Sequence, residues 1–125
     1  MLQCLIVAAD CADRQHLARL LRPYGFELAI VGTAKQAFSI LWRQRLDLVV
    51  MPANLHGLES HDFISLLRKA SRGREPKVLV FSERPQPGLI ARAILSGASE
   101  CFLKPFDAPI IDLKLRQVGA LQTGI

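Results

Sequence analysis

Short apolar runs alternate along the chain with segments whose apolar residues recur at helical spacing. Residues 2–9 form a continuous apolar run, and residues 48–51 and 78–81 repeat the pattern. Such runs are typical of strands covered on both faces, so they predict three central strands. Residues 26–31 alternate weakly, which suits a strand nearer the sheet edge, and residues 100–103 predict a fifth strand.

Five amphipathic helices are predicted between and after these strands. Their apolar positions are Leu17, Leu20, Leu21 and Tyr24; Ala34, Ala37, Phe38 and Leu41, with Trp42 on the same face; Phe63, Leu66, Leu67 and Ala70; Ile90, Ala93 and Ile94; and Ile111, Leu115 and Val118. Thr33 and Gln36 have the spacing of a capping box, which would begin the second helix. Gly25 is placed to end the first.

A strand followed by a helix, five times over, predicts an α/β domain with a parallel sheet between two layers of helices. Parallel neighbours need a crossover of about a dozen residues, and a helix supplies it. We expect a single domain over residues 1–125. Ligands of such sheets bind beyond the carboxyl ends of the strands. The chemistry is therefore expected at residues 8–10, 51–53, 82–83 and 104–105.

The composition is that of a globular protein: 50% of the residues are hydrophobic and 22% are charged. The first apolar run meets Asp10 well before the ~20 residues that a membrane span requires, so no membrane association is expected. Cys4, Cys11 and Cys101 show neither the pattern of a disulfide framework nor the spacing of a zinc site. This cysteine usage fits a reducing cytoplasm, and no metal site is predicted.

The net charge of +5 is concentrated in part between residues 68 and 77, where Arg68, Lys69, Arg72, Arg74 and Lys77 lie. Such a run could bind nucleic acid or an acidic partner. The alternative is a solvated loop after a helix, which the absence of interleaved aromatic residues favours.

The predicted strand ends carry three motifs in a fixed order. Ser82 closes the fourth strand, residues 97–99 read Gly-Ala-Ser, and residues 104–106 read Lys-Pro-Phe. Together they resemble the receiver domain of two-component response regulators over residues 2–121. The resemblance implies a flavodoxin-like, CheY-like three-layer fold with five helices and a five-stranded parallel sheet of order 2-1-3-4-5. It also implies a cis bond between Lys104 and Pro105.

The chain departs from the family where phosphorylation takes place. The family has an acidic pair after the first strand, a phosphoacceptor aspartate after the third, and a small residue after the hydroxyl of the fourth. The matching positions hold Ala8 and Ala9, Pro52 and Glu83. Methyl groups cannot bind Mg²⁺, and proline has no nucleophile. We therefore expect no catalytic residue, no Mg²⁺ and no cofactor, with Ser82, Lys104 and Pro105 as remnants of the pocket.

Two nearby charges have more than one reading. Asp10 could bind a cation, but it is more readily explained as the residue that caps the N-terminus of the first helix. Lys104 has lost its acidic partners, so it is expected to turn toward Glu83 or Asp10 or to reach solvent, unless its segment only shapes the turn. His16, His56 and His61 share no ligand spacing and receive no role. A redox role for Cys101 stays open.

By resemblance, the function is then recognition through the face made by the fourth helix, fifth strand and fifth helix. The residues assigned to this face are Leu89, Ile90, Arg92, Cys101, Phe102, Asp107 and Lys114. The partner is a second copy or another signalling protein. The chain would be a stand-alone receiver or the input domain of a transcriptional or signalling regulator. Two alternatives remain: nucleic-acid binding by residues 68–77, and phosphorylation at a non-standard hydroxyl such as Ser82.

Overall fold

The structure, a computed structural model, describes residues 2–55, 58–71 and 75–120. Its main sheet has five parallel strands, which are β1 (Gln3–Val7), β2 (Glu27–Val31), β3 (Leu48–Pro52), β6 (Lys77–Ser82) and β7 (Glu100–Leu103). Their order is β2-β1-β3-β6-β7. Counted along the chain within this sheet, the strands have the predicted order 2-1-3-4-5, and only the labels β6 and β7 depart from it. A short antiparallel pair, β4 (Asn54–Leu55) and β5 (Leu58–Glu59), follows β3 along the chain.

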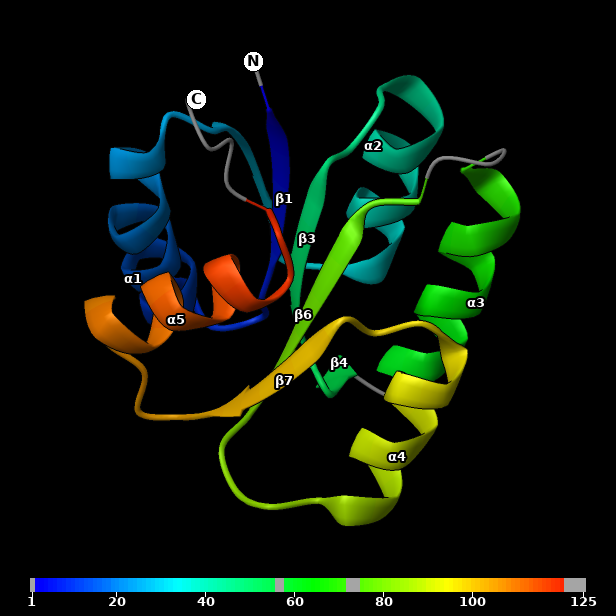
Figure 1. Ribbon diagram of the computed structural model, residues 1–125. Helices are drawn as coiled ribbons and strands as arrows, with labels where there is room; N and C mark the ends of the chain where they lie inside the picture. Colours follow the sequence, from blue (N-terminus) through cyan, green and yellow to red (C-terminus); the bar gives the residue numbers. More distant parts are fainter. Residues whose placement is uncertain (1, 56–57, 72–74, 121–125) are drawn as a thin grey trace.

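Helices cover both faces of this sheet (Figure 1). The helical segments are α1 (Cys11–Leu21), η1 (Arg22–Tyr24), α2 (Ala34–Arg43), α3 (Ser60–Ala70), α4 (Pro87–Ser96) and α5 (Ala108–Gln117). Helices α1 and α5 lie on one side, and α2, α3 and α4 lie on the other. The predicted α/β class is thereby confirmed.

Each face of the sheet has its own apolar core. Toward α1 and α5, the core includes Ile6, Val50 and Leu79, and toward the other helices it includes Leu5, Val49 and Val80. Successive residues of a strand point to opposite faces, so neighbours in the sequence enter different cores. The central strands read as continuous apolar runs because both of their faces are buried.

Side-chain caps fix where α1 and α2 begin, as the sequence indicated. The Asp10 carboxylate accepts a hydrogen bond from the Ala12 amide at 2.8 Å, which confirms its capping role in α1. The Thr33 hydroxyl accepts a hydrogen bond from the Gln36 backbone amide at 3.1 Å. The Gln36 side-chain oxygen in turn accepts one from the Gly32 amide at 3.0 Å. The reciprocal bond thus lies one residue earlier than the predicted capping box would place it.

Gly25 ends the first helical segment with a φ of 82°, in the left-handed region that suits glycine. A turn of 3₁₀ helix, η1, separates it from α1, so Tyr24 lies beyond the α-helix that the apolar spacing predicted. The first strand is likewise shorter than its apolar run, since Ala8 and Ala9 lie beyond its end.

Trp42 was predicted on the apolar face of α2, and this prediction was wrong because the side chain is 71% exposed. The buried stripe of α2 centres on Ala37, with Ala34, Ile40 and Leu41 partly buried beside it. At 100° per residue, Trp42 lies about 140° from Ala37 around the helix. No helix in the described ranges is both long and apolar enough to cross a membrane.

Candidate functional site

A cavity of about 510 Å³ lies at the carboxyl ends of the central strands, where the fold class predicted the site. We call it the strand-tip pocket. It is lined by Ala8, Ala9, Asp10, Asp13, Pro52, Ala53, Asn54, Leu55, Phe81, Ser82, Glu83, Arg84, Gln86 and Lys104. Of the predicted site residues, the structure brings Ala8, Ala9, Pro52, Ser82 and Lys104 together. Pro105 lies outside the lining.

The end of β1 brings no ionisable side chain to the pocket. Ala8 and Ala9 contribute only methyl and backbone atoms to the lining. Their carbonyl groups accept hydrogen bonds from one guanidinium nitrogen of Arg14, at 2.7 Å and 3.0 Å. These two hydrogen bonds satisfy the backbone acceptors, and through them Arg14 holds the turn after β1.

The end of β3 likewise brings no ionisable side chain to the pocket. Pro52 is its last residue and lies opposite Phe81 of β6 in the parallel register. The missing amide of proline is tolerated there, and the ladder continues through the Ala53 amide, which donates to the Phe81 carbonyl at 2.8 Å. The β4–β5 pair follows, while His56 and Gly57 lie outside the described residues.

Lys104 provides the ammonium of the pocket, and two carboxylates hold it. Its Nζ lies 2.8 Å from Asp13 Oδ1 and 3.5 Å from Glu83 Oε1. The hydrogen bond to Asp13 is the main cause that raises the pKa of Lys104 above its ordinary value, against a smaller lowering by burial. The predicted turn toward Glu83 is confirmed, while the alternative partner Asp10 is wrong because Asp10 caps α1.

Asp13 is the site residue that sequence reasoning missed. It lies in the first turn of α1, directly after the strand tip of β1. Side chains of a helix lean toward its N-terminus, so an acid in this turn leans toward the strand tips. That rule, applied to Asp13 and to the lysine after the fifth strand, could have predicted the ion pair.

The Ser82 hydroxyl is buried and fully engaged. It donates to the Arg84 carbonyl at 2.5 Å and accepts from Gln86 Nε2 at 2.9 Å. Ser82 itself is 4% exposed. The hydroxyl therefore fixes the loop between β6 and α4, and its own proton is used in doing so.

The segment after β7 is anchored by an aromatic cluster. The Lys104–Pro105 bond is cis, as predicted. Phe106 is buried, and its ring packs on Phe81 and Phe102 with centroids 5.6 Å and 5.2 Å apart. His16 of α1, which received no role from the sequence, is hydrogen-bonded to the Phe106 carbonyl at 2.7 Å. These contacts set the backbone from which Lys104 reaches the pocket.

Burial does not favour a redox role for Cys101. It is half-buried, and burial is the main cause that raises the pKa of its thiol, with Glu100 adding to the rise. Since the thiolate is the reactive form, this environment makes the sulfur less reactive. Cys101 acts as a small apolar residue packed on the core beneath α4.

The predicted recognition face requires one correction. Phe102 is only 6% exposed because its ring belongs to the core under α1 and α5, so it cannot contact a partner. Leu89, Ile90 and Cys101 are partly buried against the other core.

The polar members of that face are more accessible, although each has an intramolecular contact. Asp107 is exposed and caps α5. Half-buried Lys114 lies 3.5 Å from Glu100.

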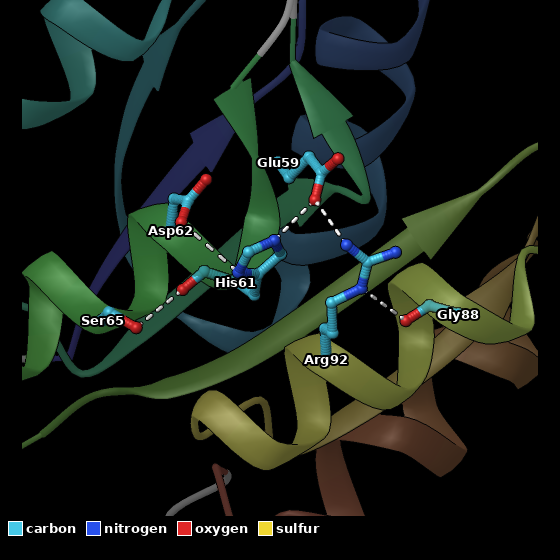
Figure 2. Close-up of polar contacts among 6 residues, drawn as sticks. All are labelled: Glu59, His61, Asp62, Ser65, Gly88 and Arg92. Atoms are coloured by element: carbon cyan, nitrogen blue, oxygen red, sulfur yellow. Dashed lines mark hydrogen bonds and ion pairs between the residues drawn. The ribbon is translucent and has the colours of Figure 1, made fainter.

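Arg92, assigned to the same face, connects α4 to the beginning of α3 (Figure 2). Its guanidinium lies 3.5 Å from a carboxylate oxygen of Glu59 and donates to the Gly88 carbonyl at 3.3 Å. The same Glu59 oxygen lies 2.5 Å from His61 Nε2, and His61 Nδ1 lies 3.4 Å from Asp62. His61 thus joins a network of polar contacts that connects α3 to α4 and lies apart from the strand-tip pocket.

Large apolar side chains are exposed on the elements of the recognition face. Leu95 of α4 is 83% exposed and Leu103 of β7 is 46% exposed, while Leu113 of α5 is 48% exposed. Ile94 and Ile110 add to this set. All five lie on α4, β7 or α5, the elements to which the sequence assigned the recognition face.

The basic stretch is only partly described, since Arg72, Gly73 and Arg74 lie outside the described residues. Arg68 is engaged within the molecule: its Nε lies 3.3 Å from Glu75 Oε1, and its Nη1 donates to the Ser96 carbonyl at 3.0 Å. Gly97, with a φ of 124°, leaves room for this side chain, because a Cβ there would lie 3.1 Å from Arg68 Cδ. Arg68 therefore also serves to join α3 to α4.

Comparisons with known proteins agree with this geometry. The chain is 30% identical over 113 residues to the response regulator protein FleR of Pseudomonas aeruginosa, covering 90% of this chain and 24% of FleR. It is 28% identical over 102 residues to the DNA-binding response regulator MtrA of Mycobacterium tuberculosis, covering 82% of this chain and 43% of MtrA. The chain thus spans less than half the length of these relatives.

A solved structure shows the same fold. The signal receiver domain of an HD domain-containing protein from Pseudomonas fluorescens Pf-5 is 26% identical and matches with a TM-score of 0.84, covering 94% of this chain and 93% of that one. The model of the response regulator receiver domain matches residues 4–116. From the sheet order, the strand-tip pocket and this match over most of its length, the chain belongs to the response regulator receiver domain family.

Proposed function

We propose that this chain is a receiver domain that acts by binding a protein partner and does not accept a phosphoryl group. One observation carries the proposal. The strand-tip pocket contains only methyl groups and a pyrrolidine ring, from Ala8, Ala9 and Pro52, at the positions where the family resemblance expects three carboxylates. Phosphoryl transfer needs a nucleophile and a metal ion that spreads the developing charge.

The state of Lys104 supports the same proposal. A lysine that neutralises a phosphoryl group must offer its ammonium to the incoming oxygens, whereas Lys104 is already paired with Asp13 and Glu83. An incoming phosphate would have to break these pairs and approach two carboxylates, which repel it. The ammonium of Lys104 is thus neutralised without a ligand, and the lining holds three acids, Asp10, Asp13 and Glu83, against two bases, Arg84 and Lys104.

Ser82 is a poor substitute acceptor for the same kind of reason. Its hydroxyl proton is donated to the Arg84 carbonyl, and the residue is buried. Phosphorylation there would break two hydrogen bonds and place a dianion beside Glu83. This argues against a non-standard phosphorylation site.

A backbone amide NMR titration with Mg²⁺ and beryllofluoride, a mimic of an aspartyl phosphate, tests this part of the proposal. We expect no saturable shifts at Ala53, Ser82 and Lys104, which lie in the pocket lining. The matched control is the triple variant Ala8→Asp, Ala9→Asp, Pro52→Asp, which returns the expected carboxylates and should respond if the fold is kept. Saturable shifts at those amides in the unmodified chain would contradict the proposal.

The exposed apolar side chains of α4, β7 and α5 are the proposed contact surface, with a second copy or another signalling protein as partner. Their exposure in a charged domain is the supporting observation, because exposed apolar patches mark contact sites. The three cysteines are free thiols, which fits a reducing cytoplasmic setting.

Self-association across micromolar concentrations, measured by sedimentation velocity, tests the choice of surface. Leu95→Lys should abolish a dimer formed through α4, whereas Trp42→Lys on α2 should not, although Trp42 is also 71% exposed. Loss of association in the Trp42 variant alone would move the surface to α2.

A further inference from the structure

A second cavity, of about 280 Å³, lies on the side of α1 that faces the edge strand β2. It is lined by Cys11, Arg14, Gln15, Ala18, Arg19, Arg22 and Ile30. We call it the arginine groove. Its α1 and η1 residues recur at spacings of three and four, so they form one stripe along the helical segment. Three of the seven lining residues are arginines, and none is acidic.

Two of these arginines have no counter-charge. Within the described ranges, the side chains of Arg19 and Arg22 form no ion pair or hydrogen bond, and both residues are exposed. They stand three residues apart, a spacing that places like charges side by side on a helical surface. The nearest acids of α1 are used elsewhere, since Asp10 caps the helix and Asp13 pairs with Lys104.

The third arginine is fixed in place. Arg14 donates to the carbonyls of Ala8 and Ala9, and Gly32 leaves space for it, because a Cβ there would lie 2.7 Å from Arg14 Nη1. Its positive charge is therefore held at one end of the groove, while its backbone acceptors carry no net charge. The groove combines one rigid guanidinium with two free ones.

The shape and lining of the groove indicate the ligand. A guanidinium forms paired, charge-assisted hydrogen bonds with phosphate oxygens. Ala18 and Ile30 add apolar surface, with Ile30 39% exposed, and Gln15 adds a neutral polar group. The volume of about 280 Å³ lies just below the range of roughly 300–1,000 Å³ for small-molecule sites, so only a small ligand fits. We infer that the arginine groove binds a small anion with two linked phosphate groups, which Arg19 and Arg22 would neutralise.

The site also touches the turn that lines the strand-tip pocket. Arg14 lines the arginine groove and holds Ala8 and Ala9, which line the strand-tip pocket. A ligand that binds the Arg14 guanidinium would therefore change the environment of that turn. The amides of Ala8 and Ala9 serve as reporters on the far side of α1.

Titration of the folded chain with inorganic pyrophosphate, followed by backbone amide NMR and by calorimetry at ~0.15 M salt, tests the inference. We expect saturable shifts at Arg19, Arg22 and Ile30. The double variant Arg19→Gln, Arg22→Gln should bind on the order of tenfold or more weakly, because two charge-assisted contacts are lost. The matched control, Arg43→Gln with Arg45→Gln, removes the same charge from the end of α2 and should bind as the unmodified chain does.

Adenosine diphosphate and a short single-stranded oligonucleotide complete the test. Tighter binding of the nucleotide than of pyrophosphate supports an organic diphosphate that also uses Ile30, and equal binding supports the free anion. Shifts spread over the whole surface, equal losses in both double variants, or binding of the oligonucleotide alone would each overturn the inference.

Discussion

The strand-tip pocket and the arginine groove lie on opposite sides of α1, and they differ in whether their charged side chains are paired. Toward the pocket, α1 presents Asp13, which pairs with Lys104 at 2.8 Å. Toward the groove it presents Arg19, and η1 adds Arg22, neither with a counter-charge among the described residues. The lysine of the strand-tip pocket is thus already paired with a carboxylate, whereas two arginines of the groove have none.

We expect pocket size to be a poor guide to binding capacity in this chain. The strand-tip pocket has the larger volume, about 510 Å³ against about 280 Å³. A ligand of the larger pocket must compete with formed ion pairs and hydrogen bonds, whereas an anion in the smaller groove meets donors without partners. We therefore expect substitutions around the pocket to affect stability and substitutions around the groove to affect ligand binding.

The largest difference is expected between the apolar residues of the two regions. Phe81 lines the pocket and is buried against Phe102 and Phe106, so Phe81→Ala should lower the free energy of unfolding by about 3–5 kcal/mol. Ile30 lies at the groove and is 39% exposed, so Ile30→Ala should cost roughly 1 kcal/mol or less. Urea unfolding measures both. Equal losses would show that the groove is part of the core.

The ion pair of the pocket gives an intermediate effect with a defined pH dependence. Asp13→Asn should lower the free energy of unfolding by about 1 kcal/mol at neutral pH, because Lys104 loses its nearer carboxylate. Glu83→Gln is the matched control, and its cost should be smaller, since Glu83 is 3.5 Å away and 75% exposed.

The direction of the pH effect follows from the raised pKa of Lys104, which the hydrogen bond to Asp13 causes. Because this pKa is raised in the folded state, the protonated lysine stabilises that state. The stabilisation is complete below the ordinary pKa of 10.5 and is lost as the pH rises through the pKa of the folded state. The gap between the unmodified chain and Asp13→Asn should therefore be constant at neutral pH and shrink above 10.5. A gap that grows at alkaline pH would mean that Lys104 is not the partner.

The smallest effect is expected for the free arginines. Arg19→Gln with Arg22→Gln should change the free energy of unfolding by no more than about 0.5 kcal/mol, and in the stabilising direction, because neighbouring like charges repel. Thermal unfolding at low and high salt measures it, with the stabilisation fading as salt is added. A loss of several times that size would show that these side chains hold the fold together.

Most of the fold could be predicted because its signals are local. Continuous apolar runs marked the central strands, and helical spacing marked the five α-helices. The errors occurred where a helix or strand ends and the pattern outlasts it. Ala8 and Ala9 continue the apolar run after β1 has ended, and Trp42 follows the apolar spacing of α2 although the stripe has rotated away. The β4–β5 pair carries no periodic signal, since each strand has two residues.

The site was predicted less completely because its contacts are not local. The fold class located the strand-tip pocket and the resemblance assigned its positions, but 91 residues separate Asp13 from Lys104. Phe102 was assigned to the recognition face by the resemblance, yet the alternation of side chains along β7 places its ring in the core. The arginine groove was hidden for another reason. Its charges are spaced along a helix, so they form no dense basic run in the sequence such as the one at residues 68–77.

If the strand-tip pocket does not take a phosphoryl group, intact-mass measurement after incubation with acetyl phosphate and Mg²⁺ should detect no change. A receiver with the full acidic set, treated in parallel, shows that the reagent is active. We predict that the mass of this chain stays unchanged, because no carboxylate is present at Ala8, Ala9 or Pro52. An added phosphoryl group on a residue of the pocket lining would contradict the account.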